Sequence, residues 1–223
     1  MTPIEHFEGV WGRCAELSAL HAYLANNVSS VLCPDELLRA EWVARLSALD
    51  LYIHELVAQL MLATFEGGRP ATPAYLKFRL SNETLDRIRA AATASDASAA
   101  FDLEARDQLG YLTYQDPEKI AEGVRLCSNV ELWNEVALNL GATAATKTSQ
   151  AKLLKRDLSL IVQRRNKIAH EGDLQPTSVR EPWPISQSDL TFVENHIERV
   201  VRAIDAVVYC AVSTISPGVW RLR

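Results

Sequence analysis

Hydrophobic residues recur every three or four positions along most of the chain, which is the spacing of helices that bury one face. The first such segment runs from Ile4 to Leu24, and Pro34 opens a longer one that stops at Gly67. The apolar positions of this longer segment face one way: Leu38, Trp42, Leu46, Leu49, Ile53, Leu56 and Leu60. We therefore expect it to be the long core helix of the fold.

The region that follows is less regular. Ser81 can cap a short helix through Arg89, an Ala/Ser-rich stretch comes next, and Phe101 to Leu112 has a weak helical pattern. We interpret residues 71–115 as a helical insert within a single domain that spans residues 1–223.

The second half of the chain predicts four helices, at about 117–127, 132–140, 149–170 and from 187 onward. Asp116 with Pro117 is a helix start, and Ser186 with Asp189 has the pattern of a capping box. The last helix keeps a heptad seam that suits bundle packing or a dimer partner: Val193, Ile197, Val200, Ile204, Val207 and Ala211. Without an alternating strand pattern, a Gly-rich phosphate loop or an internal repeat, the sequence predicts an all-α bundle.

Composition indicates a protein that can bury its own core. The chain has 223 residues, of which 48% are hydrophobic and 23% charged. Its four cysteines are scattered and lack the paired spacing of a zinc site, so we expect reduced core thiols and no bound metal or cofactor. The amino terminus lacks a basic region followed by an apolar run, and no apolar stretch is long enough for a membrane span. These features predict a cytoplasmic protein with no membrane partner.

The charged residues indicate a possible binding surface in only one segment of the chain. The formal net charge of −5 argues against a surface that binds nucleic acid everywhere. One basic patch stands out, interrupted by a single acid: Lys152, Lys155, Arg156, Arg164, Arg165 and Lys167. A solvated helix face explains such a patch as well as a binding surface does.

Arg165 falls on the apolar stripe of the helix at 149–170, between Ile161 and Ile168. A guanidinium stays charged, so burying it without a partner is unfavourable. A structural salt bridge to Asp50, Glu55 or Glu131 is one explanation.

The next turn of this helix carries side chains that could take part in a reaction. Asn166 and His170 are four residues apart and project from one face, while Arg165 lies about 140° from His170 around the helix axis. Gly172 allows the helix to end just after His170. Because histidine transfers protons near neutral pH and arginine matches phosphate, the trio suits phosphoryl chemistry without metal.

These residues carry a resemblance to a known family. The segment RNKIAH, from Arg165 to His170, resembles the R-polar-x3-H motif of HEPN proteins. Two further segments, ALDLYIHEL from Ala48 and YQDPEKIAEGVRLC from Tyr114, resemble the early and middle regions of the branch labelled RiboL-PSP. The resemblance covers most of residues 38–172 and leaves the first helix and residues 71–101 poorly matched.

The resemblance implies a HEPN-type helical bundle that dimerises across the motif helix and cuts RNA without metal, through attack by the ribose 2′-hydroxyl. On this sequence His170 would move the proton, Arg165 would neutralise charge on the phosphorane, and Asn166 would help hold the phosphate. Arg164 also lies within motif spacing of His170. Arg165 is preferred because it is followed by the polar Asn166 and lies on the interior stripe, whereas Arg164 is interpreted as a solvent-facing substrate contact.

Three more residues are candidates for substrate binding, with ordinary explanations beside them. Lys167 belongs to the basic patch. Asp50 and His54, one helical turn apart, could orient His170 or extend the site, or could form a simple intrahelical pair.

Two functions of different classes remain open. The first is an RNA endonuclease that leaves 2′,3′-cyclic phosphate ends and acts as the toxin or effector of a toxin–antitoxin or antiphage system. Such an enzyme would need a regulatory partner, either an antitoxin or a sensor. The second is a non-catalytic HEPN module that binds RNA or nucleotide, or serves as a scaffold. A toxin modified by nucleotide transfer to tyrosine fits less well, because the residue two positions after His170 is Gly172.

Overall fold

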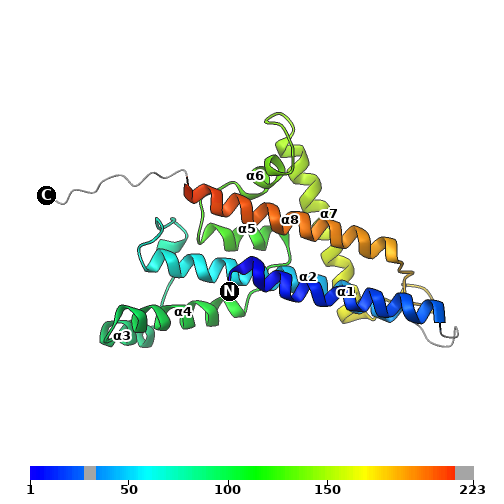
Figure 1. The fold of residues 1–223 in the computed structure, drawn as a ribbon, viewed down its shortest axis with the longest axis horizontal. Helices are drawn as coiled ribbons and strands as arrows, with labels where there is room; N and C mark the ends of the chain where they lie inside the picture. The colour runs from blue at the N-terminus through cyan, green and yellow to red at the C-terminus, as the bar shows by residue number, and fades with distance from the viewer. Residues whose placement is uncertain (28–33, 214–223) are drawn as a thin grey trace.

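The structure, a computed structural model, describes residues 1–27 and 34–213 (Figure 1). Its elements in chain order are α1 (Pro3–Asn27), α2 (Asp35–Phe65), the 3₁₀ turn η1 (Tyr75–Lys77), α3 (Asn82–Ala90), α4 (Ala94–Gly110), α5 (Pro117–Arg125), α6 (Leu132–Asn139), α7 (Lys147–Glu171) and α8 (Gln187–Ser213). Over these described ranges the only pairing of β type is one bridge between Leu174 and Pro182. The predicted all-α class is confirmed.

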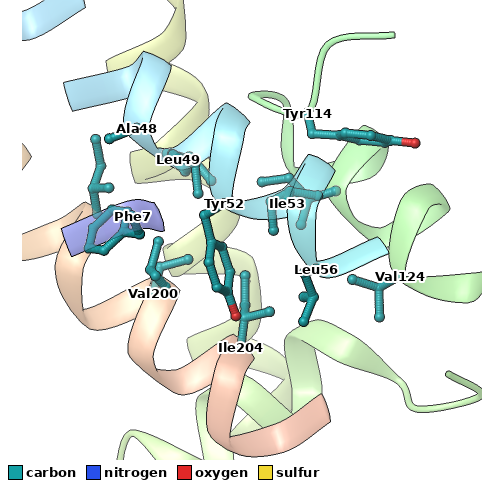
Figure 2. Close-up of a cluster of buried hydrophobic side chains, with 14 of the residues drawn as sticks. Phe7, Ala48, Leu49, Tyr52, Ile53, Leu56, Tyr114, Val124, Val200 and Ile204 are labelled. Atoms are coloured by element: carbon teal, nitrogen blue, oxygen red, sulfur yellow. The ribbon is translucent and has the colours of Figure 1, made fainter. Parts of the chain in front are cut away.

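Helix α2 is the centre of the bundle. Figure 1 shows α1, α2 and α8 running lengthwise and α7 passing across them, with α6 beside the first turns of α7. The sequence pattern assigned α2 one apolar face, but the helix is buried on most sides, because Tyr52, Val57 and Met61 are also enclosed. Figure 2 shows Tyr52 reaching between Phe7 of α1 and Ile204 of α8. This central position explains why apolar residues lie on more than one face of α2, which follows Pro34 and runs from Asp35 to Phe65.

Helix α2 is long and apolar enough to cross a membrane, because the mean hydropathy of its most apolar 18 residues is 1.3. Of these 18 residues, 56% are buried inside the protein. The core helix of a soluble domain can have the same length and composition, so the central position of α2 explains its apolar sequence.

The heptad seam of α8 packs inside the chain. Val193, Ile197, Val200 and Ile204 are completely buried, whereas Val207 is only partly so. The side chain of Ala211 lies outside the described residues. Because these positions already face the core, the seam serves bundle packing, and a dimer would need another surface.

Helix α4 is more regular than the sequence pattern predicted. Thr93 and Asp96 form a reciprocal capping box that starts it within the Ala/Ser-rich stretch. Phe101, Ala105 and Leu109 are buried and belong to the same core cluster as α2. Residues 94–110 therefore contribute to the main core.

A tight approach between Gly123 and Tyr114 joins α5 to the linker before it. A Cβ placed on Gly123 would lie 2.6 Å from Cε1 of Tyr114, whose side chain is buried. We predict that Gly123→Ala destabilises the fold by about 1–3 kcal/mol through overpacking. Denaturant unfolding measures this, and in a Tyr114→Leu background most of the cost should disappear.

The matched control is Gly9→Ala in α1, where nothing lies within 4 Å of the added methyl group. This change should stabilise the protein by up to about 1 kcal/mol, because alanine favours helix. An equal cost of Gly123→Ala with Tyr114 present or replaced would contradict the proposed clash.

His196 of α8 faces α7 and gives the fold a dependence on pH. Burial lowers the pKa of His196 below 6.5, although Asp157 opposes the shift, and its Nε2 is buried without a hydrogen-bond partner among residues 1–27 and 34–213. As pH falls below about 6.5, the unfolded chain takes up this proton before the folded chain does, so stability is lost on the acid side and is unaffected well above that value. We predict that His196→Asn loses less free energy of unfolding than wild type between about pH 7 and about pH 5. Parallel curves for the two proteins would show that His196 does not contribute.

Candidate functional site

The candidate site lies at the carboxyl end of α7. Gly172 ends this helix in the left-handed conformation, with φ of 63°, and its N–H donates to the Lys167 carbonyl. This confirms the predicted helix end after His170. Of the predicted apolar stripe, Leu158 and Ile161 are buried, whereas Leu154, Arg165 and Ile168 are half-buried. Trp42 of α2 anchors this stretch, because its indole N–H donates to the Ile161 carbonyl at 3.0 Å.

Arg164 does not face solvent, so its interpretation as a solvent-facing substrate contact is wrong. Its Nη2 donates to Oδ2 of Asp173 at 2.6 Å, and the arginine side chain is 23% exposed whereas the aspartate is fully buried. The same nitrogen also approaches the carbonyl oxygens of Trp183 and Pro184, at 3.3 and 3.2 Å. The reason is helical phase: residue 164 points towards the loop that returns from the end of α7 to α8.

Asp173 is the centre of this network. Its Oδ2 also accepts from Nε of Arg39 at 3.0 Å, and Nη2 of Arg39 donates to the Trp183 carbonyl at 2.6 Å. The backbone of Asp173 is left-handed, with φ of 57°, and its carbonyl accepts from the Trp183 N–H. One buried carboxylate thus connects the first turns of α2, the end of α7 and the loop before α8. We call these three side chains, Arg39, Arg164 and Asp173, the Asp173 network.

Arg165 has a different environment from its neighbour. Its Nη1 donates to Oδ1 of Asn166 at 3.0 Å and not to a buried carboxylate. The Nε atoms of both arginines are buried without a hydrogen-bond partner in the described part of the chain. The carboxylates considered as structural partners are used elsewhere, because Asp50 approaches His54, Glu55 binds Arg106 and Glu131 accepts from Asn134. A half-buried guanidinium thus lies beside an exposed amide.

Asn166 and His170 are exposed one turn apart on the last two turns of α7. With Arg165 they bring a cation, an amide and an imidazole to one end of one helix. Such a set can bind an oxyanion and exchange a proton with it. Among the described residues, no three His, Cys, Asp or Glu side chains gather closely enough to hold a metal ion.

The structure does not bring Asp50 and His54 to this place. The part of α2 that lies near the end of α7 is the turn of Arg39, which binds Asp173. Asp50 lies eleven residues further along α2, so the helical rise separates it from Arg39 by about 16 Å. The Asp50 carboxylate accepts from the Tyr114 N–H and the Gln115 amide, and the His54 ring packs on Tyr114 at 4.7 Å. The pair therefore fastens the linker between α4 and α5, and the suggestion that it orients His170 is not supported by this position.

Lys167 is exposed, and its Nζ lies 5.8 Å from the centre of the Trp183 ring. The distance is near the limit of a cation–π contact. Lys167 thus lies beside the trio and its charge is available to a ligand.

Comparison with protein-family models, with curated proteins and with solved structures found no match to this chain.

Sequence reasoning missed Arg39 and Asp173. They are separated by 134 positions, and a glutamate–glycine–aspartate sequence after a helix is read first as a polar loop. The available signal was the pair of adjacent arginines, because only one of them, Arg165, can lie on the apolar stripe and the other, Arg164, needs a partner of its own.

The Asp173 network leads to a test of stability. Asp173→Ala leaves two guanidinium groups near a buried site without their carboxylate, which should cost about 3–5 kcal/mol. Thermal or urea unfolding measures the loss. Glu181→Ala, which removes an exposed carboxylate from the same loop, is the control and should change stability by less than about 0.5 kcal/mol. Equal, small effects would contradict the structural role of Asp173.

Proposed function

We propose that this protein is a metal-independent RNA endonuclease of the HEPN type, with Arg165, Asn166 and His170 as its reaction centre. The observation that carries the proposal is the contrast between the two arginines of the motif. Arg164 is bound to a buried aspartate, whereas Arg165 keeps its guanidinium beside Asn166, at the end of the helix where His170 is exposed. The R-polar-x3-H spacing from Arg165 therefore describes groups that the Asp173 network does not hold, which supports their assignment to the reaction centre.

In the proposed reaction, His170 removes the proton of the ribose 2′-hydroxyl, whose oxygen then attacks the adjacent phosphorus. Arg165 stabilises the negative charge that builds on the phosphorane oxygens, and Asn166 holds the phosphate by hydrogen bonding. The 5′-oxygen leaves with a proton, so the products are a 2′,3′-cyclic phosphate and a 5′-hydroxyl. Each chain supplies one motif histidine, and the acid and the base of such a reaction are two separate groups.

A homodimer that places two α7 helices together would supply both groups. The heptad seam of α8 is already buried inside the chain, so it does not provide the dimer surface. Helix α7 itself presents Leu153 and Leu160, two turns apart and 41% and 54% exposed. This apolar stripe on the motif helix is the surface that we assign to the second copy.

The proposed biological role is that of a cytoplasmic toxin or effector in a toxin–antitoxin or antiphage system. A general RNA-cutting activity in the cytoplasm requires restraint. His170 is exposed among residues 1–27 and 34–213, and we assign the restraint to a separate antitoxin or sensor protein.

The alternative is a non-catalytic module that binds RNA or nucleotide. One observation favours it: Asp50 and His54, which could have oriented His170, are used to fasten the linker before α5. A binding module would keep its affinity for RNA after loss of His170 and would release no fragments.

The direct test is cleavage of end-labelled cellular RNA in excess chelator. Wild type should cut and leave 2′,3′-cyclic phosphate ends. His170→Ala should lower the rate by about 10²- to 10⁴-fold, because proton transfer is lost. Arg165→Ala should lower it by about 10²- to 10³-fold, because charge stabilisation in the transition state is lost.

His6→Ala and Arg13→Ala remove the same residue types from α1, at a half-buried position beside Glu55 and at an exposed one, and as matched controls they should cut like wild type. Folded wild-type protein that leaves RNA intact, both alone and with the protein encoded beside it, would contradict the nuclease. It would favour the binding module.

A further inference from the structure

The basic patch of α7 extends to the end of the helix opposite His170, where Lys152 and Lys155 lie. A cavity of about 450 Å³ opens between α5, α6 and the first turns of α7. Its polar lining includes Glu118, Arg125, Glu131, Thr148, Lys152 and Lys155. Nothing in the proposed reaction uses this cavity.

The charges in the cavity are only partly balanced within the chain. Lys155 donates to Glu118 at 2.8 Å, and Glu131 accepts from the Asn134 amide at 3.0 Å. Arg125 and Lys152 are exposed and have no carboxylate partner within the described residues. Two cations therefore have no ion-pair partner, and because the Glu131 carboxylate also keeps its charge, the lining carries a net charge of +1.

Helical geometry connects this cavity to the reaction centre. Lys152 and His170 are eighteen residues apart, which is five full turns, so they lie on the same face of α7 and about 27 Å apart along its axis. The positions between them within about 40° of this line are all polar: Arg156, Ser159, Gln163 and Asn166. The two acids of α7, Asp157 and Glu171, lie about 140° and about 100° away from the line, although the Asp157 carboxylate reaches Arg156 at 2.8 Å.

A polar stripe free of acids thus runs from the cavity to His170. It is exposed except at Ser159, which is half-buried. The whole helix carries seven Lys or Arg and two Asp or Glu, a formal charge of +5 within a chain of −5. A polyanion with regularly spaced charges is complementary to such a stripe, and a protein partner would require apolar anchors that the stripe lacks.

We infer that the cavity of Arg125 and Lys152 is a remote anchor for the phosphate backbone of single-stranded RNA, which then follows the polar stripe of α7 to His170. This inference rests on the proposed function for its cleavage centre, but the anchor itself is a binding site. Binding by the anchor is independent of base identity, because cations contact phosphates and not base edges. The anchor also does not change during the reaction, so it lowers KM without changing kcat.

The test compares two double variants in a His170→Ala background, in which cleavage does not disturb binding. Arg125→Ala with Lys152→Ala removes the anchor. Lys77→Ala with Arg87→Ala removes the same charge from exposed positions in η1 and α3, away from α7. The probe is labelled oligouridylate of about twenty nucleotides, titrated by fluorescence anisotropy at several salt concentrations.

The anchor variant should bind the oligouridylate at least about tenfold more weakly, and the slope of log affinity against log salt should become shallower by about 1.4, for two phosphate contacts on a single strand. The control variant should match its parent. With His170 restored, the anchor variant should show a higher KM for long RNA at unchanged kcat. Equal binding by both double variants would overturn the anchor. Binding that depends on Arg125 and Lys152, combined with a wild type that does not cut RNA, would contradict the nuclease and leave the anchor standing.

Discussion

The buried carboxylate of Asp173 is the interaction on which the candidate site depends. It is fully enclosed and accepts hydrogen bonds from two guanidinium groups, one at the start of α2 and one near the end of α7. An enclosed charge is tolerated only when its partners are held in place, so the network ties three segments of the chain to one another. His170 lies three residues before Asp173, and its position relative to the bundle follows from this connection.

The same network distinguishes two adjacent residues of identical chemistry. A step of one residue turns the helix by about 100°, which is enough to direct Arg164 into the returning loop and Arg165 towards Asn166. One arginine is then structural and the other is available to a ligand. Spacing alone admits either residue as the partner of His170, whereas position in the fold favours Arg165.

Periodicity and capping residues predicted much of this fold. Pro34, Ser81, the Asp116–Pro117 pair and Gly172 mark helix ends in the structure as they did in the sequence, because each acts through local backbone geometry. The missed features depend on distant partners. No local pattern shows that Arg39 meets Asp173 or that Asp50 caps the linker at Tyr114, and the pattern of α8 did not reveal whether its seam was internal or intermolecular.

The part of the candidate site that lies on one helix was predicted from the sequence, and the part that depends on contacts between helices was not. The trio of Arg165, Asn166 and His170 comes from one helix, so helical spacing was sufficient to bring its members together. The proposed orienting pair, Asp50 and His54, belongs to another helix, and its contribution depended on the register between α2 and α7. Trp42 meets Ile161 and Arg39 meets Asp173, and this register leaves Asp50 about three turns away from the site.

The most direct test of the assignment is a comparison of Arg164→Ala with Arg165→Ala, measuring the free energy of unfolding and the rate of RNA cleavage on the same preparations. Loss of Arg164 should remove a partner of the buried Asp173 and lower the free energy of unfolding by about 3 kcal/mol or more. Loss of Arg165 should leave stability within about 1 kcal/mol of wild type and lower the cleavage rate by about 10²- to 10³-fold, since among the described residues that guanidinium binds the exposed Asn166 and no carboxylate. A stable, inactive Arg164→Ala together with an unstable Arg165→Ala that still cuts RNA would reverse the two roles and contradict the account.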